Sequence, residues 1–446
     1  MQTRNDTQKL SLINGRIHTQ SSTASCITFE HGRIVSIDDE AASLSGKVID
    51  LHGRTVLPGF CDSGLDFLDW AENQERLNLS NIRSAKELTA SLTAWAQADS
   101  NEAPLRGWYI AQGLPGTVHI SRDDLDDAIP SRPCAVIDAD KTHAVLNTPA
   151  MSEFNMPQDN TELEGFIQHL PPLSPEDVIY LVKTYAPKVN ALGITEVWAD
   201  FSQGIDSGKL LDTLFNEAYE FLTFRLRANF GFEDVNTLND FLAAGLRTGD
   251  GLPFCRMGGI LVNDSLKQEE QKNMINSAHV SGCQIIGTSN QYCINALERV
   301  IKRFRKNSRH LLRGFSVNNS LVDRMRILGL GGIAEAGQND DRLYETFRNG
   351  IVISAGSGQV LASPLKSIGG LIEHGLSVAE ALNVYTWACA WNGGTESRRG
   401  ELAVGNDADV VVLEQDPFSV KPEETAGIDV TMTFSAGRMV YDSGAV

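Results

Sequence analysis

The sequence predicts an α/β fold: a (β/α)8 TIM-like barrel with a small β-sandwich formed by both termini. The middle of the chain alternates short apolar runs typical of strands with longer stretches typical of helices. Repeated strand–helix units of this length favour parallel strands joined by crossover helices. A doubly wound open sheet is the structural alternative, but no glycine-rich dinucleotide fingerprint follows an early strand. The barrel is therefore the preferred prediction.

Both ends of the chain are rich in short strands separated by turns. Asn14-Gly15 and His31-Gly32 separate β-rich runs near the amino terminus, as tight hairpin turns do. From Gly400 onward the chain gives further strands, with a hairpin at residues 435–437. We therefore expect one composite β-sandwich domain from residues 1–57 and 396–446, and a barrel from residues 58–395.

The candidate barrel strands are short runs dominated by Val, Ile, Leu and Ala. In chain order they are PCAVIDAD, ITEVWADF, FRLRANF, CRMGGILV, CQIIGTS, RHLLRGFS, GGIAEAG and GIVISAG. Helical stretches lie between them, and Ser84 and Ser377 precede two of these stretches. Glu87 and Glu380 follow three residues later, which is the spacing of a helix N-cap and its first-turn acid.

The composition is that of an acidic globular protein of 446 residues. The chain has 38 Lys and Arg against 57 Asp and Glu, a formal charge of −19, and no long basic run. This balance argues against binding to nucleic acid or to an anionic membrane. The 7 cysteines form no CxxC pair and lie mostly in apolar surroundings, as reduced, buried thiols do. With no apolar signal core and no run of about 18 apolar residues, a cytoplasmic location is expected.

Residues 56–69, VLPGFCDSGLDFLD, begin the predicted barrel. Side chains two positions apart on a strand point the same way, so Gly64 and Asp66 are expected to face one side together. This stretch resembles the opening barrel strand of the amidohydrolase superfamily, where PGF-(I/V)-D-x-H-x-H carries two metal-binding histidines. The resemblance places Gly64 and Asp66 at those two histidine positions.

The resemblance covers most of the chain. LINGRI, VIDLHGRTVLPGF and RRGELAVGNDADVVVL are similar to the composite amidohydrolase layout, in the same order. RGWYIAQGLPG, DKTHAVLNTPAM and NALGITEVWAD look like the amidohydrolase-3 branch, which includes YtcJ-like and N-substituted formamide deformylase-like proteins. The resemblance implies one or two divalent metals, usually zinc, at the carboxyl end of the barrel. Such a metal activates water and polarises a scissile carbonyl.

The other ligand positions that the resemblance implies are also changed. Three of them hold Thr288, Gly314 and Gly358, and the place of a bridging ligand falls unsettled within residues 256–258. His279 and His310 are nearby in sequence, but each matches a non-ligand position of its motif. Glycine and threonine cannot replace imidazoles and a carboxylate. We therefore expect the usual metal site to be missing and no cofactor to be bound.

Residues in and near the first barrel strand also suggest other kinds of site, namely an oxygen-ligand metal site and a nucleophile. Asp62, Asp66 and Asp69 could supply oxygen ligands to Mg²⁺ or Ca²⁺, but no further oxygen ligands can be identified. Asp62 and Asp66 are expected to point inward, whereas Cys61 alternates outward toward the surrounding helices as a small buried hydrophobe. Ser357 lies between two glycines, but it lacks the G-x-S-x-G context of a nucleophile elbow.

His143 matches a histidine that this branch keeps beside its substrate site, and Asn147 accompanies it. A functional and a purely structural histidine both remain open there. Trp198 occupies a place where relatives often have a histidine, and we favour the interpretation that its ring fills the space left by the metal. Asp66 and His143 are the candidate catalytic residues. The candidate substrate pocket consists of Gly64, Asp66, His143, Asn147, Trp198, Thr288, Gly314 and Gly358.

Three hypotheses for the function follow. In the first, the protein is an amidohydrolase relative that is no longer a conventional metal-dependent hydrolase and binds a small molecule as a regulatory or assembly pseudoenzyme. The second is an atypical hydrolase of non-peptide C–N bonds, such as amides or formamides, with a rebuilt or differently metallated site. The third is an ordinary zinc hydrolase with displaced ligands. The expected partner is a small molecule, and the resemblance alone suggests a homodimer.

Overall fold

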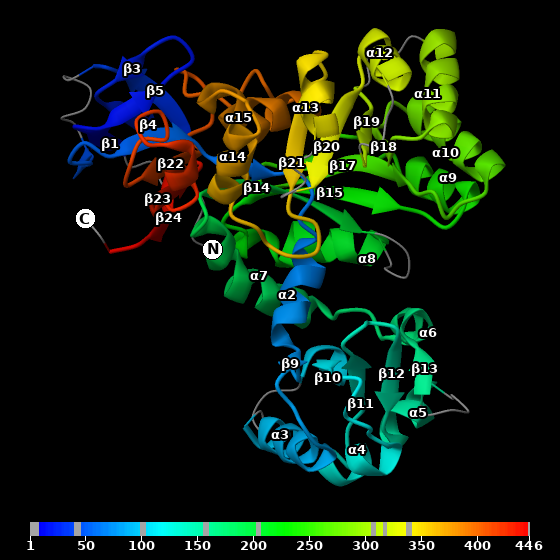
Figure 1. Cartoon of the computed structure of the whole chain (residues 1–446). Coiled ribbons are helices and arrows are strands. Elements are labelled where there is room, and N and C mark those ends of the chain that lie inside the picture. The colour runs from blue at the N-terminus through cyan, green and yellow to red at the C-terminus, as the bar shows by residue number, and fades with distance from the viewer. Residues whose placement is uncertain are drawn as a thin grey trace. The chain divides into compact units, whose positions relative to one another are not determined.

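The computed structural model describes residues 9–39, 46–98, 104–154, 160–201, 207–304, 309–314, 319–335 and 341–444 (Figure 1). The chain divides into two compact units. Unit 1 comprises Met1–Phe67, Val182–Gln203 and Ser207–Val446, and unit 2 comprises Leu68–Leu181 and Gly204–Asp206. Unit 1 holds the barrel and the β-sandwich, and unit 2 holds a separate sheet with its own helices.

The barrel of unit 1 is a sheet of parallel strands joined by crossover helices. A parallel bridge between Leu65 and Gly358 connects the last strand back to the first, so the barrel is nearly closed. This arrangement confirms the predicted TIM-like fold. A short β16 (Gly251–Leu252) pairs with β17 outside the ring. The ring order is β8 (Phe60–Asp62), β14 (Ile194–Phe201), β15 (Arg225–Gly231), β17 (Cys255–Val262), β18 (Ile285–Thr288), β19 (Leu311–Arg313), β20 (Gly331–Glu335) and β21 (Ile353–Gly356).

Amphipathic helices accompany the barrel strands. In α11 (Gln291–Phe304), Cys293, Leu297 and Val300 are buried at the three- and four-residue spacing of one helix face. The predicted cap before α15 (Val378–Val384) is confirmed, because Ser377 and Glu380 form a reciprocal capping box. The other helical elements of unit 1 are α8 (Ser207–Asp212), η2 (Thr213–Glu217), η3 (Tyr219–Phe221), α9 (Val235–Ala243), α10 (Gln268–Ser281), α12 (Asn319–Leu328), α13 (Asp341–Arg348), α14 (Pro364–Glu373), α16 (Trp387–Gly393) and α17 (Pro422–Thr425).

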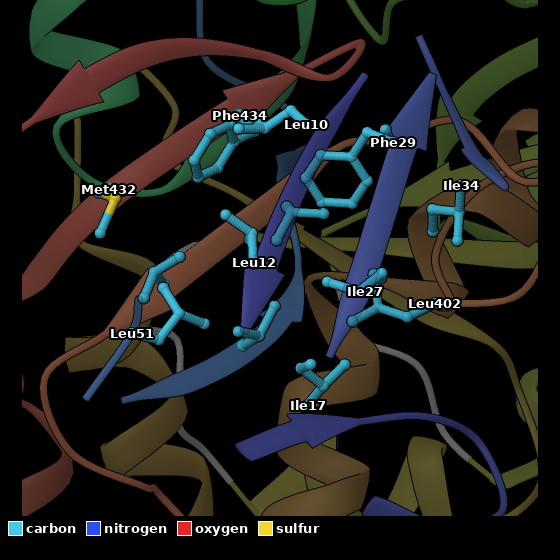
Figure 2. Packing of buried hydrophobic residues seen from close by; sticks show 14 of the residues in the cluster. Leu10, Leu12, Ile17, Ile27, Phe29, Ile34, Leu51, Leu402, Met432 and Phe434 are labelled. Carbon is cyan, nitrogen blue, oxygen red and sulfur yellow. The ribbon is translucent and has the colours of Figure 1, made fainter. Parts of the chain in front are cut away.

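The β-sandwich contains strands from both ends of the chain, as predicted. Val56 of β7 lies opposite Val412 of β22, which joins the two ends in one antiparallel pair. Both residues belong to an apolar core that also includes Leu12, Phe29 and Phe434 (Figure 2). One sheet has the order β24 (Arg438–Asp442), β23 (Val430–Ser435), β22 (Val410–Leu413), β7 (Thr55–Pro58), β2 (Arg16–His18) and β3 (Thr23–Ala24). The other has the order β5 (Arg33–Ile37), β4 (Ile27–Glu30), β1 (Leu10–Ile13) and β6 (Lys47–Asp50).

Two predicted hairpin turns are present in the sandwich. His31 and Gly32 both have positive φ, as do Ala436 and Gly437. Two consecutive positive φ angles are the requirement of a type I′ turn, which matches the twist of antiparallel strands. The exact boundaries predicted between sandwich and barrel stay a prediction.

Unit 2 was not expected as a separate unit. Its sheet has the order β13 (Asn160–Glu162), β12 (His143–Leu146), β11 (Cys134–Asp138), β10 (Tyr109–Leu114) and β9 (Leu77–Asn78). The segment PCAVIDAD, expected in the barrel, therefore forms β11 of this sheet, and that placement was wrong. Alternate residues of β11 enter two different apolar clusters, so both faces are covered. A strand buried on both faces has the same continuous apolar sequence in either setting.

Helices accompany the unit 2 sheet, and the chain passes between the units within α2 (Phe67–Glu75) and α7 (Pro175–Asn190). Among the described residues, no helix combines the length and the apolar character needed to cross a lipid bilayer. The remaining helical elements of unit 2 are α3 (Ala85–Ala98), η1 (Leu105–Gly107), α4 (Arg122–Ala128), α5 (Thr148–Phe154) and α6 (Leu163–His169).

Candidate functional site

An ion pair crosses the carboxyl end of the barrel, which we call the barrel mouth. Arg313, the last residue of β19, donates from Nη2 to Oδ1 of Asp200 at 3.0 Å. Its Nη1 donates to Oδ2 of the same carboxylate, which makes the contact bidentate. Asp200 lies near the end of β14, four places from β19 in the ring. The pair therefore spans the mouth from one side to the other.

Neighbouring groups hold this ion pair in place. Asn229 of β15 donates from Nδ2 to Oδ1 of Asp200 at 2.9 Å, and its own Oδ1 accepts from the backbone N of Gly259 at 2.8 Å. Burial alone would lower the pKa of the Arg313 guanidinium, but the Asp200 carboxylate, with a smaller contribution from Asp66, raises it above its ordinary value. A permanent cation therefore occupies the mouth.

Asp200, Asn229 and Arg313 were not among the site residues predicted from the sequence. A signal for Asp200 was present, because it lies two residues after Trp198 and so shares its face of the strand. Arg313 directly precedes Gly314, one of the changed ligand positions. Neither signal showed that the two side chains would meet.

Gly64, Asp66 and Gly358 come together where β8 and β21 close the barrel. The backbone N of Gly358 donates to the carbonyl of Gly64 at 3.0 Å, and the N of Asp66 donates to the carbonyl of Gly358 at 3.2 Å. The chains approach so closely that a Cβ on Gly356 would lie 2.2 Å from the N of Gly64. Glycine is required at position 356 by this approach.

Hydrogen bonds of Asp62 also connect the ends of β8 and β21. Its carboxylate accepts hydrogen bonds from the backbone N of Ser357 at 2.9 Å, from the Ser357 hydroxyl, and from the N of Gly64 at 3.1 Å. Burial raises the pKa of Asp62 above its usual value, although these hydrogen bonds act in the opposite direction. The Ser357 hydroxyl also accepts from the N of Ala362 at 3.0 Å. These contacts give both side chains a structural role.

Thr288 and Gly314 lie beside Arg313. Thr288 ends β18 and stands opposite Arg313 in the parallel register, and Gly314 follows Arg313 with a φ of 70°. Five of the predicted pocket residues therefore lie at the carboxyl end of the barrel, namely Gly64, Asp66, Thr288, Gly314 and Gly358.

Trp198 fills part of the barrel interior. Its side chain is fully buried, and Nε1 donates to Oε1 of Glu196 at 2.8 Å. It belongs to a cluster with Ile286, Ile333 and Cys61. Cys61 is buried as expected, but it packs against these interior residues, so its expected outward direction was wrong. The reason is a register shift between β8 and β14 at Ile194 and Glu196, which places Cys61 opposite Glu196, on the face of β14 that also carries Trp198.

His143 and Asn147 belong to unit 2, whereas the other predicted pocket residues belong to unit 1. The His143 side chain is 52% exposed, and its Nδ1 lies 2.9 Å from Oγ1 of Thr142. Asn147 is fully buried, and its Oδ1 accepts from the backbone N of Cys134 at 2.9 Å. Its Nδ2 donates to two backbone carbonyls at 2.8 Å each. These bonds describe a structural asparagine, and a substrate role for either residue stays a prediction.

The donor set at the mouth does not fit the divalent metal implied by the resemblance. Gly64, Gly314 and Gly358 have no side-chain donor, and the guanidinium of Arg313 opposes a second cation. Residues 256–258, the place of the bridging ligand, lie in the amino-terminal half of β17, away from the mouth. Within the part of the chain that the structure describes, no group of three or more His, Cys, Asp or Glu could hold a metal ion.

A (β/α)8 barrel combined with a β-sandwich from both termini is the architecture that the resemblance to composite amidohydrolases implied. A family model described as the amidohydrolase family (Amidohydro_3) matches residues 47–241 and 364–441. The chain belongs to this family, and the predicted branch is confirmed. A Bacillus subtilis (strain 168) protein named "Putative amidohydrolase YtcJ" is 20% identical over 515 residues, covering 92% of this chain and 93% of that protein.

Solved structures share the fold at low sequence identity. An uncharacterized metal-dependent hydrolase from Pyrococcus furiosus has a TM-score of 0.77 at 18% identity, covering 92% of this chain and 100% of its own. Another from Pyrococcus horikoshii OT3 has a TM-score of 0.77 at 18% identity, covering 93% and 99%. A triazine hydrolase from Arthobacter aurescens has a TM-score of 0.60 at 14% identity, covering 98% and 95%. At these identities the likeness shows the fold alone.

Proposed function

We propose that this amidohydrolase-family protein is not a conventional metal-dependent hydrolase and that it uses the barrel mouth to bind a small molecule. The observation that carries the proposal is the bidentate ion pair between Arg313 and Asp200 across the mouth. A guanidinium is always charged and donates hydrogen bonds only, so it cannot ligate a metal and repels one nearby. A protein of this kind acts as a binding or regulatory member of its family.

The mouth suggests the chemistry of the ligand. A guanidinium recognises planar carboxylate and carbonyl groups through two parallel hydrogen bonds. The carboxylate of Asp66 also interacts electrostatically with the Arg313 guanidinium. The Arg313 and Asp200 side chains are 31% and 20% exposed, so solvent can reach the ion pair. We therefore expect a small ligand with a carboxylate or an amide carbonyl that exchanges with Asp200 on the guanidinium.

Elemental analysis tests the proposal. Protein produced with added Zn²⁺ and then desalted should contain far less than stoichiometric zinc, because the mouth supplies too few donors. Stoichiometric zinc, together with hydrolysis of N-acyl compounds that a chelator abolishes, would show that the protein is an ordinary metal-dependent hydrolase.

A variant that restores the lost histidines sharpens this experiment. Gly64→His combined with Asp66→His recreates the first ligand pair, and a Cβ at position 64 would stand 3.4 Å from Gly356 Cα, which is tolerable. We expect this variant to bind zinc weakly while Arg313 remains in the mouth. Tight zinc binding by this variant alone would mean that more of the metal site survives than we propose.

The second candidate is an atypical hydrolase of amide or formamide C–N bonds. The position of Asp66 favours this candidate, because its carboxylate interacts electrostatically with the Arg313 guanidinium. In such a reaction Asp66 would serve as the general base, and the guanidinium of Arg313 would stabilise the oxyanion. N-formyl and N-acyl compounds should then be hydrolysed in the presence of a chelator. The activity should fall in Asp66→Asn and, if the second catalytic candidate is correct, in His143→Ala. Asp323→Asn, at an exposed position of α12, is the control. The absence of turnover with every compound would support binding alone.

A further inference from the structure

A second polar pocket lies at the amino-terminal end of the barrel strands, opposite the mouth. It has a volume of about 500 Å³, and among the residues that the structure describes no acidic side chain lines it. Thr248, Gln284 and several glycines form part of its wall. Its charged lining consists of Arg227 of β15, Arg256 of β17, Arg309 before β19, and Arg398 and Arg399 after α16. We call it the arginine pocket.

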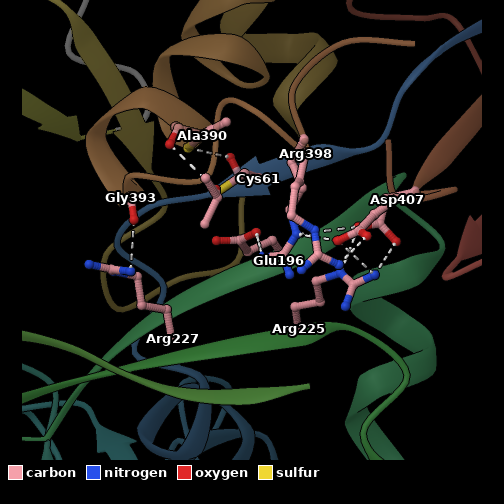
Figure 3. Close-up of polar contacts among 12 residues, drawn as sticks. Cys61, Glu196, Arg225, Arg227, Ala390, Gly393, Arg398 and Asp407 are labelled. Carbon is pink, nitrogen blue, oxygen red and sulfur yellow. Dashed lines mark hydrogen bonds and ion pairs between the residues drawn. The ribbon is translucent and has the colours of Figure 1, made fainter. Parts of the chain in front are cut away.

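Three of these arginines form ion pairs with carboxylates that are not among the residues lining the pocket. Arg399 donates to Glu196 at 2.9 Å, and Arg309 donates to Glu396 at 2.5 Å. Arg398 donates to Asp407 at 2.8 Å, and Figure 3 shows it converging on that carboxylate. These pairs connect the barrel with the chain that leads into the sandwich, so they have a structural explanation.

Arg227 has no carboxylate in ion-pair contact within the described part of the chain. Its Nη1 donates to the carbonyl of Gly393 at 3.2 Å (Figure 3). Its Nη2 donates to Oε1 of Gln284 at 2.8 Å, and its guanidinium lies over the Trp198 ring at 4.8 Å from the ring centroid. The residue is only 5% exposed, and its Nε has no hydrogen-bond partner among the described residues. Burial lowers the pKa of Arg227 to about 10, so the group is still charged at neutral pH. A buried donor without a partner is costly unless a ligand satisfies it.

Arg256 is the second arginine of the pocket that has no carboxylate in ion-pair contact within the described ranges. Its Nη1 donates to the carbonyl of Gly249 at 2.6 Å. The pKa of Arg256 is lowered, first by burial and then by repulsion from Arg399, Arg398 and Arg225. The pocket therefore contains two guanidiniums that have no carboxylate in ion-pair contact among the described residues, although the charges of Glu196 and Asp407 act on them from a greater distance.

We propose that the arginine pocket binds a small molecule that carries a phosphate group. Two guanidiniums without a carboxylate in ion-pair contact match the charge of about −2 that a phosphate monoester carries at neutral pH. The planar donor fork of arginine also fits two phosphate oxygens. Small-molecule pockets range from about 300 to 1,000 Å³, so the remaining volume accommodates an organic part as well. The site is at the other end of the strands from the barrel mouth, so it is independent of the function proposed above.

Isothermal titration calorimetry in a low-salt, phosphate-free buffer tests this site. The probes are inorganic phosphate, pyrophosphate, glycerol phosphate and citrate. We expect the phosphates to bind saturably at one site per chain and more weakly as salt increases. Arg256→Gln should weaken the binding at least roughly tenfold, because one charge-assisted contact is lost. Tighter binding of glycerol phosphate than of inorganic phosphate would assign the ligand to an organic phosphate.

Arg326→Gln, on the exposed face of α12, is the matched control and should bind like the unchanged protein. Arg227→Lys, which keeps the buried charge, serves as a second variant and should weaken binding because the Nε donor is lost. The proposal is wrong if no phosphate probe binds at concentrations of about 10 mM, or if Arg256→Gln binds as tightly as the unchanged protein. Binding of citrate without any phosphate would also overturn it. The zinc content of the protein reports on the barrel mouth alone, so the two proposals fail separately.

Discussion

At the scale of single residues, two buried histidines illustrate how hydrogen bonds determine a protonation state. The backbone N of Ile285 donates to Nδ1 of His310 at 3.0 Å, so neutral His310 must carry its proton on Nε2. That Nε2 lies 2.8 Å from Nδ1 of His279 and donates to it. Burial, together with the neighbouring His279, lowers the pKa of His310 to about 3. These histidines matched non-ligand positions in the sequence, and their contact with each other and with Ile285 holds His310 in its neutral Nε2–H form.

The stability of the protein should therefore depend on the protonation of His310. Its pKa falls from 6.5 to about 3 on folding, so the unfolded chain binds more protons between these values. The stabilisation is complete above pH 6.5 and is lost as the pH falls toward 3. For each pH unit of acidification within this range, the titration of His310 should lower the free energy of unfolding by up to about 1.4 kcal/mol.

Urea unfolding between about pH 5 and 7 measures this slope. The matched variant is His310→Asn, whose Oδ1 can still accept from Ile285 but cannot titrate. The slope should be smaller in this variant than in the unchanged protein, whatever its absolute stability. Equal slopes would mean that His310 does not titrate as its burial requires.

At the scale of elements, two glycines are explained by close packing. A Cβ on Gly356 would lie 2.2 Å from the N of Gly64, and a Cβ on Gly331 would lie 2.1 Å from Oδ1 of Asn392. Asn392 itself donates to the carbonyl of Gly332 at 2.9 Å, which holds α16 against β20. Glycine at these strand ends therefore allows neighbouring elements to approach.

Gly356→Ala should destabilise the closure of the barrel between β8 and β21. A methyl group that meets backbone atoms cannot be accommodated by a side-chain rotation, and overpacking of this kind costs about 1–3 kcal/mol. The control is Gly427→Ala, where the nearest atom to a Cβ is 3.6 Å away, so its stability should stay within about 0.5 kcal/mol. Midpoints of urea unfolding compare the two, and equal midpoints would contradict the closed joint.

The elements also show what the sequence could predict. The strand–helix units of the barrel were predicted because their signals are local, such as the buried face of α11 and the capping box at Ser377. The segment at β11 was placed in the wrong sheet because an apolar run identifies a strand without identifying its partners. Unit 2 was missed for the same reason.

At the scale of the whole molecule, the features that were missed depend on residues far apart in sequence. Arg313 and Asp200 are separated by 113 positions, and no local pattern relates them. The arginine pocket draws on β15, β17, the segment before β19 and the segment after α16. The resemblance identified which ligand positions had changed, but it could not show that an arginine now spans the mouth.

Two arginines of the pocket, Arg398 and Arg399, together with Arg225 connect the barrel with the chain that enters the sandwich within unit 1. Asp407, just before β22, has a side chain that is only 4% exposed and forms ion pairs with Arg225 at 3.4 Å, Arg398 at 2.8 Å and Arg399 at 2.9 Å. Burial alone would raise the pKa of Asp407, but Arg225 and Arg399 lower it below its ordinary value. The carboxylate is therefore stabilised in its charged form by folding.

Asp407→Asn should test this junction, because it leaves Arg225 and Arg399 buried with less neutralising charge. Removing one partner of a buried ion-pair network costs about 3–5 kcal/mol. Glu414→Gln, which breaks a pair with Arg54 that leaves Glu414 47% exposed, should cost no more than about 1 kcal/mol.

Because the folded pKa of Asp407 is depressed, its contribution is present above the ordinary value of 3.8 and lost as the pH falls below it. Urea unfolding should therefore show a large deficit for Asp407→Asn at neutral pH that shrinks in acid. A deficit that is independent of pH would indicate lost packing in place of lost charge.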